Sequence, residues 1–209
     1  MKMLYFDTET GGLNPKENPL TQIAGVVEIN GEVVEKFDIK MKPFPGQIVN
    51  DTALKVQNRT LEEIMAAPDP RDQFFKLLAI FNKYVKSFDR NDKFIVAAQN
   101  GRFDVDFLHA FFVNNENPKV AKGKYQPNLF AYFWPIPLDL LHIARAAQVF
   151  CGFNPKNLKL GSICEALGIE LVGAHDALAD VLATRLCILE LKRRYFKDVK
   201  RDNYDKKNI

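Results

Sequence analysis

The chain places two acids at the end of its first apolar segment, in the stretch Phe6-Asp7-Thr8-Glu9-Thr10-Gly11-Gly12-Leu13. Met3 to Phe6 is apolar and typical of a buried strand. Side chains alternate between the two faces of a strand, so Asp7 and Glu9 would project from the same side. Neighbouring carboxylates repel each other unless a cation lies between them, and Mg²⁺ prefers carboxylate oxygen. The stretch therefore indicates a metal site, with a solvated strand end as the alternative.

Length and composition favour one globular domain. A chain of 209 residues suits a single domain with a full core, and 47% hydrophobic and 26% charged residues argue against wholesale disorder. No run of about 18 apolar residues occurs, so we expect no membrane span. Asp7 and Glu9 also interrupt the N-terminus before a signal-peptide core could form. The three cysteines lie outside any C-x-x-C spacing, which favours reduced thiols in a cytoplasmic protein.

The net charge of +3 is distributed unevenly. Eight Lys or Arg and three Asp lie from Lys192 to Ile209, so the end of the chain is basic and the rest slightly acidic. We predict a single domain over residues 1–196 and a basic C-terminal tail over 197–209. Such a tail contacts a nucleic-acid backbone or is simply a solvated, frayed end.

Hydrophobic patterning predicts an α/β fold. The expected strands are Met3 to Phe6, Leu20 to Ile29, Val33 to Met41, Phe94 to Ala98 and Ile136 to Leu141. Asn30-Gly31 predicts a hairpin between the second and third. The expected helices are short ones within 50–67 and longer ones at Phe74 to Phe88, Phe103 to Val113, Leu140 to Val149, Leu158 to Leu167 and His175 to Phe196. Residues 114–135 form an insertion, read either as a long loop or as a small hairpin.

Two further segments carry acids, one at the start of a helix and one among apolar residues. Asp104 and Asp106 begin a helix directly after a buried strand, where a capping charge is the ordinary explanation. Asp180 lies among apolar residues, and an acid in such surroundings usually has a metal or a cation as its partner. His175 precedes Asp180 by five residues and, taken alone, is an ordinary surface or capping histidine.

Taken together, these segments resemble one family. The motifs FDTETGGLNP, AAQNGRFDVDFL and HDALADVLAT occur in order, joined by LDLLHIARAA and LKLGSICEALGIE. From Lys2 to about Leu189 the chain resembles the DnaQ-like (DEDDh) 3′–5′ exonucleases and is similar to the proofreading exonuclease subunit or domain of DNA polymerases. The resemblance implies a ribonuclease H-like fold, with a central five-stranded mixed β-sheet flanked by α-helices.

The resemblance also assigns the metal site. It matches four residues to the acids that bind two Mg²⁺ ions, for which we expect Mn²⁺ to substitute: Asp7, Glu9, Asp104 and Asp180. Asp7 would bridge the ions, and His175 matches the general base. Asp106 stays as a weaker alternative to Asp104, whereas Asp139 and Asp176 are interpreted as structural.

Six residues are assigned to the substrate: Thr8, Thr10, Gly11, Leu13, Asn100 and Phe103. Gly11 and its neighbour Gly12 would let backbone amides approach the terminal nucleotide, although a plain turn explains them equally simply. Leu13 matches an apolar wedge against the last base, and Asn100 a polar contact. Phe103 is a stacking platform or, more simply, part of the core.

The chain departs from its relatives at two places. Many relatives carry Val-His-Gly-Ile before a Thr, whereas this chain has Val56-Gln57-Asn58-Arg59-Thr60 and lacks that histidine. The 114–135 insertion interleaves lysines with aromatic residues: Lys119, Lys122, Lys124, Tyr125, Phe130, Tyr132 and Trp134. Such residues contact phosphates and stack on bases, or else form a packed hairpin or a protein-binding patch.

These observations predict a metal-dependent exonuclease that shortens DNA from its 3′ end, on single-stranded or frayed ends, and proofreads beside a DNA polymerase. Two ions about 4 Å apart clamp the attacking and leaving oxygens of phosphodiester hydrolysis. A histidine with a pKa near 6.5 accepts the proton of the attacking water, and nucleoside 5′-monophosphates are released. The alternatives are trimming of RNA 3′ ends and a non-catalytic subunit that binds nucleic acid or a polymerase.

Overall fold

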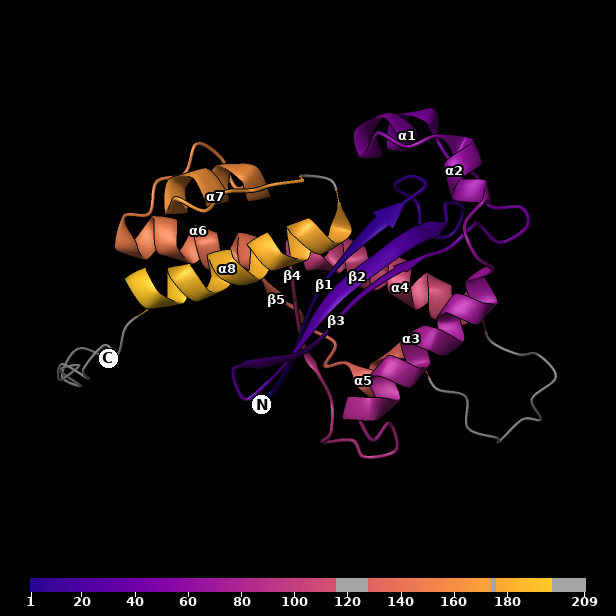
Figure 1. Cartoon of the computed structure of the whole chain (residues 1–209). Coiled ribbons are helices and arrows are strands. Elements are labelled where there is room, and N and C mark those ends of the chain that lie inside the picture. Colours follow the sequence, from indigo (N-terminus) through magenta and orange to yellow (C-terminus); the bar gives the residue numbers. More distant parts are fainter. Residues whose placement is uncertain (116–127, 174–175, 197–209) are drawn as a thin grey trace, which may run out of the picture.

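The computed structural model describes residues 1–115, 128–173 and 176–196, and a five-stranded mixed sheet forms the centre of this part (Figure 1). The strand bounds are β1 Lys2–Thr10, β2 Leu20–Ile29, β3 Glu32–Lys40, β4 Ile95–Ala98 and β5 Leu138–Asp139. The strands lie in the order β3-β2-β1-β4-β5. β1, β2 and β3 pair antiparallel, whereas β4 runs parallel to β1 and β5 parallel to β4. The predicted sheet is thereby confirmed.

The turn between β2 and β3 forms where the Asn-Gly pair predicted it. Asn30 has φ 53° and Gly31 has φ 95°, the positive values that a tight hairpin turn requires. Ile29 pairs with Glu32 directly across the turn. This short connection lets β3 return beside β2, while β1 pairs with β2 on one side and β4 on the other and so lies in the middle of the sheet.

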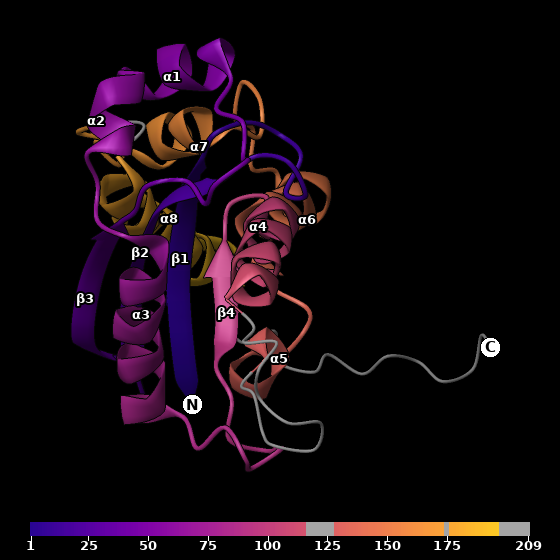
Figure 2. The same cartoon turned by 90° about the vertical axis from the view of Figure 1, so that its right-hand side faces the viewer.

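Helices cover both faces of the sheet. Their bounds are α1 Asp51–Gln57, α2 Leu61–Met65, α3 Pro70–Tyr84, α4 Gly101–Asn114, α5 Leu129–Tyr132, α6 Leu140–Cys151, α7 Leu160–Leu167 and α8 Ala177–Tyr195. Helices α3, α4 and α5 pack on one face, and α6, α7 and α8 on the other (Figures 1 and 2). The side chains of β1 alternate between these two cores: Leu4 and Phe6 face the first, Met3 and Tyr5 the second. α1 and α2 lie beyond the end of the sheet, near the C-terminal end of β1 (Figure 2).

Three predicted boundaries move for local reasons. β1 continues to Thr10 because it pairs with β2 along its whole length, so the two acids lie within the strand and not after it. α3 begins at Pro70 behind the N-cap Asp69 and ends at Tyr84, four residues before the predicted end. β5 has only two residues, because Asp139 caps α6 by accepting a hydrogen bond from the N–H of Leu141.

The described end of the 114–135 insertion belongs to the core. α5 begins at the N-cap Asn128, and Leu129, Tyr132 and Phe133 are fully buried. The hydroxyl of Tyr132 donates to Oδ1 of Asn82 over 2.8 Å. Tyr132 is therefore not available for stacking on a base, because packing under α3 and α4 already covers its ring. Trp134 stays partly exposed, with the ammonium group of Lys93 over its ring.

Several predictions fall on residues that the structure does not describe. Lys119, Lys122, Lys124 and Tyr125 lie outside the described residues, as does the basic tail 197–209. Within the described ranges, no helix has the length and apolar character needed to cross a membrane.

Asp139 joins the two parallel strands at the edge of the sheet, as its predicted structural role requires. Its two carboxylate oxygens accept the N–H groups of Asn100, Gly101 and Leu141 at 2.9–3.0 Å. One buried carboxylate thus holds the turn that leads from β4 into α4 and the first turn of α6.

We expect Asp139→Ala to lower the free energy of unfolding by about 3 kcal/mol, because it leaves buried N–H donors without their charged acceptor. Asp139→Asn keeps one acceptor oxygen and should lose less than the alanine variant. Urea unfolding followed by circular dichroism measures both. Asp106→Ala, which removes a partly exposed carboxylate from α4, serves as the control; equal losses for Asp139→Ala and Asp106→Ala would contradict the assignment.

Candidate active site

The C-terminal half of β1 runs beyond its neighbour β4. β4 pairs with β1 only from Met3 to Tyr5, so the sheet has a step at the residues that follow. Asp7 and Glu9 continue the alternation of Met3 and Tyr5 and therefore face the α8 side. Asp180, in the first turn of α8, faces them from that side and contributes its charge to both. Three acids from two elements thus meet at the end of β1.

Asp104 joins this group from α4. It is buried in the first helical turn, and its Oδ1 accepts the backbone N–H of Thr8 at 3.0 Å and the Thr8 hydroxyl at 2.6 Å. The carboxylate thus takes the place that a strand partner would occupy beside β1. Thr8 was predicted to contact substrate; the structure buries it and makes its side chain a partner of Asp104.

Asp7, Glu9 and Asp104 all have pKa values above the ordinary carboxyl range. Burial is the largest cause for each of them. The negative charges of the other three acids raise the pKa of Asp7 further. Burial and Asp180 raise the pKa of Glu9 to about 7, whereas the positive charge of Arg59 lowers it. Burial raises the pKa of Asp104 to about 7, against the two hydrogen bonds that it accepts.

The donor chemistry of these acids fits a hard divalent cation, although they do not form a closed cage. Among the described residues, no three His, Cys, Asp or Glu side chains converge closely enough to enclose a metal ion. Mg²⁺ seldom needs such a cage, since it is commonly bound by one or two carboxylates together with water and substrate phosphates. Buried carboxylates that raise one another's pKa gain most from a nearby cation, because the cation removes their repulsion.

A cavity of about 420 Å³ opens beside Glu9. Its walls come from the end of β1, the loop that follows, α1 and the start of α4. Leu13 is 83% exposed at its rim. Phe103 lines the cavity while its ring packs 4.8 Å from that of Phe107, so it serves both core and cavity. The structure therefore brings Leu13 and Phe103 together beside the acids.

The two glycines after β1 are required by the protein's own packing. A Cβ at Gly11 would lie 2.5 Å from the ring of Pro19, and one at Gly12 would lie 2.4 Å from Oδ1 of Asn18. The N–H of Gly11 already donates to the carbonyl oxygen of Pro19 over 2.8 Å. The Gly11 amide thus has a partner within the protein, whereas Thr10 and Gly12 line the cavity beside Glu9; that this loop approaches a terminal nucleotide stays a prediction. The hydroxyl of Thr10 is likewise occupied, because it donates to the carbonyl oxygen of Gly12.

The remaining predicted residues fall into three groups. Asn100 is exposed in a left-handed conformation, with φ 59°, at the turn into α4. Asp106 forms an ion pair with Arg102 over 2.9 Å, and Asp176 caps α8 by accepting the first backbone N–H groups of that helix. Asp106 thus has its partner on its own helix, and Asp176 caps α8 while its charge also raises the pKa of Glu9. His175 lies outside the described residues.

Sequence reasoning missed two side chains near the acids, Gln57 and Arg59. Gln57 is buried, lines the cavity and donates from Nε2 to the carbonyl oxygen of Thr10 over 2.7 Å. Arg59 supplies the positive charge that acts on Glu9. The available signal is the departure of residues 56–60 from the Val-His-Gly-Ile motif. It shows that the histidine is absent, but not that Gln57 and Arg59 lie near the acids in its place.

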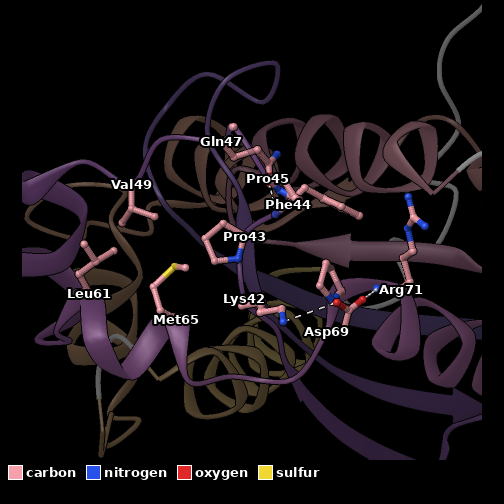
Figure 3. Close-up of a pocket in the computed structure, with 12 residues that line it drawn as sticks. Lys42, Pro43, Phe44, Pro45, Gln47, Val49, Leu61, Met65, Asp69 and Arg71 are labelled. Carbon is pink, nitrogen blue, oxygen red and sulfur yellow. Dashed lines mark hydrogen bonds and ion pairs between the residues drawn. The ribbon is translucent and has the colours of Figure 1, made fainter.

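A second, larger cavity lies away from these acids. It has a volume of about 770 Å³ and is walled by the segment after β3 together with α2 and the start of α3 (Figure 3). Pro43, Leu61 and Met65 line it, and Lys42 pairs with Asp69 across 3.6 Å at its edge. No predicted site residue lines this cavity, so size alone does not locate the candidate site.

A mixed sheet of this strand order, with helices on both faces and acids at the end of its first strand, defines a ribonuclease H-like protein. The chain belongs to the RNase_T family, whose model is described as exonuclease and matches residues 4–186. This finding confirms the resemblance to the DnaQ-like exonucleases.

Relatives with similar sequences include polymerase components. A DNA polymerase III PolC-type from Oceanobacillus iheyensis is 27% identical over 191 residues, which cover 91% of this chain and 11% of the polymerase. The DNA polymerase III subunit epsilon of Treponema pallidum is 24% identical over 183 residues, 88% of this chain and 71% of that subunit. The chain thus spans about a tenth of the length of the PolC-type relatives.

Solved structures of the same fold include Exonuclease I of E. coli. Its complex with a dT13 oligonucleotide has a TM-score of 0.72 at 24% identity and covers 93% of this chain and 41% of that one. A zinc-bound form of its complex with single-stranded DNA has a TM-score of 0.75 at 24% identity and covers 94% and 41%. These likenesses establish the fold.

The raised pKa values predict a stability that falls with increasing pH in the absence of divalent cations. The folded protein binds more protons than the unfolded chain between about pH 4, the ordinary carboxyl range, and about pH 7, so its free energy of unfolding decreases through that window. Mg²⁺ should raise the melting temperature more at pH 8 than at pH 5. Thermal melts with chelator and with Mg²⁺ measure both effects.

Asp7→Asn is the matched variant for this prediction. It removes one of the repelling charges and should raise the melting temperature of the chelated protein at pH 8 by several degrees. Asp106→Asn, at an exposed ion pair, should leave the pH dependence unchanged. A chelated wild-type protein that is more stable at pH 8 than at pH 5 would contradict the analysis.

Proposed function

We propose that this chain is a metal-dependent 3′–5′ exonuclease that hydrolyses the last phosphodiester bond of a DNA strand. The observation that carries the proposal is the group of four acids, Asp7, Glu9, Asp104 and Asp180, which three separate elements bring to one end of β1. Asp104 is buried and the other three acids are half-buried, and their mutual repulsion has no structural benefit, because solvated or neutral residues would stabilise the fold better. A binding module has no reason to keep these charges together.

The four carboxylates would hold two divalent cations, Mg²⁺ or Mn²⁺. When bound, such ions stabilise the attacking and leaving oxygens of phosphodiester hydrolysis. Asp7, which lies among the other three acids, is suited to share both ions. Thr8 fixes the carboxylate of Asp104 through two hydrogen bonds, so that its second oxygen keeps one direction. His175 is proposed as the general base that takes a proton from the attacking water, on the basis of the family motif alone.

The cavity beside Glu9 would hold the terminal nucleotide. Its volume of about 420 Å³ admits one nucleoside. Leu13 at the rim and Phe103 on the wall offer apolar surfaces to a base, and Glu9 lines the same cavity. A strand bound in this way presents its last phosphodiester bond to the acids, and cleavage releases a nucleoside 5′-monophosphate.

DNA is the proposed substrate, and a DNA polymerase is the proposed partner. Support comes from the relatives, which are polymerase III components, and from the DNA-bound structures of Exonuclease I. We also propose that residues 1–196 form the exonuclease domain and that 197–209 form a basic tail.

Degradation assays test the activity. Purified protein is incubated with 5′-labelled single-stranded DNA and RNA of one sequence, with Mg²⁺, with Mn²⁺ or with a chelator. We expect stepwise shortening of the DNA with either ion and none with the chelator. Asp7→Ala should abolish the shortening, and Asp106→Ala should retain it. Activity in Asp7→Ala would contradict the metal mechanism, and equal degradation of both polymers would remove the DNA preference.

His175→Ala tests the proposed base. General-base catalysis typically contributes about 10²–10⁴-fold, so the variant should lose at least about a hundredfold in kcat while binding DNA 3′ ends as tightly as the wild type. The rate is measured in single turnovers at pH 7.5 and the affinity by fluorescence anisotropy. A kcat within about threefold of the wild type would show that another group accepts the proton.

A further inference from the structure

The connection between α1 and α2 carries two polar side chains for which the proposed mechanism gives no role. Gln57 is the last residue of α1, and Arg59 lies two residues later. The left-handed Asn58 between them, with φ 50°, turns the chain sharply. Thr60 then starts α2 with a reciprocal capping box to Glu63. A capped helix on each side holds this short connection in one conformation.

Gln57 presents a buried acceptor without a donor. The side chain is only 9% exposed, and its Nε2 donates to the carbonyl oxygen of Thr10 over 2.7 Å. That bond fixes the amide orientation, because the flipped amide would place two oxygens against each other. Its Oε1 is buried and has no hydrogen-bond partner. The same side chain lines the 420 Å³ cavity beside Glu9.

Arg59 presents a cation without an acid. It is partly buried, its Nη1 has no hydrogen-bond partner, and it forms no ion pair with any residue in the described ranges. Its backbone N–H donates to the carbonyl oxygen of Leu54, which ties it to α1. The positive charge acts both on Glu9 and on the exposed Glu63 of α2, so the guanidinium group lies within reach of the acids and of α2. Buried hydrogen-bond donors and acceptors are normally paired. Two unpaired atoms so close in the chain, Gln57 Oε1 and Arg59 Nη1, therefore indicate that a ligand pairs with them.

We propose, building on the proposed function, that Gln57 and Arg59 position the 3′-terminal nucleotide, with Gln57 Oε1 accepting a sugar hydroxyl and Arg59 binding a backbone phosphate. The sugar of a terminal nucleotide carries a hydroxyl group that can donate a hydrogen bond, and a backbone phosphate is attached to the same sugar. One ligand can therefore pair with both Gln57 Oε1 and the guanidinium group of Arg59. A guanidinium group binds phosphate oxygens through two parallel hydrogen bonds. The pair thereby takes over the position at which many relatives carry the histidine of Val-His-Gly-Ile.

Salt-dependent binding tests the role of Arg59. A 5′-fluorescein-labelled dT10 is titrated with protein in Ca²⁺ at several salt concentrations, and its integrity is checked on a gel. Each phosphate contact on a single strand contributes about 0.7 to the slope of log K against log salt. Arg59→Gln should lower that slope by about 0.7, and Arg59→Lys should keep it while binding more weakly. Arg71→Gln, which removes an equal charge beside the other cavity, is the matched control and should leave the slope unchanged.

End-group discrimination tests Gln57. The wild type should bind a strand with a 3′-hydroxyl about tenfold more tightly than one ending in a dideoxynucleotide, the effect of one buried hydrogen bond. Gln57→Leu should lose most of that ratio. Gln57→Met, whose side chain has a similar length but no amide oxygen, should lose the ratio in the same way. Thermal melts verify that both variants are folded. The ratio compares the affinities of one variant for two strands. A variant that binds both strands more weakly by the same factor therefore keeps the ratio.

The outcomes separate the inference from the function on which it rests. A wild-type protein that binds and shortens DNA, while Arg59→Gln keeps the full salt slope and both Gln57 variants keep the end-group ratio, would overturn only the assignment of Gln57 and Arg59. A wild-type protein that neither binds nor shortens DNA would overturn the proposed function together with this inference.

Discussion

Mutual repulsion among carboxylates at the end of β1 is the constraint on which the rest of this structure depends. Asp7 and Glu9 lie on one face of a central strand, and Asp104 and Asp180 are brought to them by α4 and α8. Burial removes the water that would screen these charges, so each acid raises the pKa of Asp7. The fold holds together charges that would separate if the chain were free. A divalent cation bound at these acids would remove the repulsion and so link the stability of the domain to the proposed chemistry.

The framework around the acids supplies the energy that opposes this repulsion. Two apolar cores, one on each face of the sheet, anchor β1 on both sides. Local polar bonds then set the geometry: Thr8 ties Asp104 to the strand, and Asp139 ties the β4–α4 turn to α6. β1 extends beyond the end of its neighbour β4, so the backbone groups after Tyr5 have no strand partner on that side. The Asp104 carboxylate accepts one of them, the N–H of Thr8. The step in the sheet therefore creates the site.

The wall formed by α1 and α2 closes one side of the candidate site. Gln57 connects that wall to the end of β1 through Thr10, and Arg59 brings a cation toward Glu9. In the proposed role, a neutral amide and a fixed cation would act where the family resemblance places a histidine. A permanent charge does not titrate near neutral pH, whereas a histidine does. Binding at this wall should therefore vary less with pH than a histidine contact would.

Periodicity and turn residues are local properties, and they were enough to predict the strands and most helices, whereas the four acids were assigned through the resemblance to a family. The sequence also placed Asp139 and Asp176 as structural acids. Only the tertiary structure decided which polar groups are already used by the protein: the Gly11 amide is bonded to Pro19, and Tyr132 lies in the core. It alone revealed Arg59 beside Glu9. The physical reason is that burial and partner choice arise from contacts between residues far apart in the chain, about which local spacing carries no information.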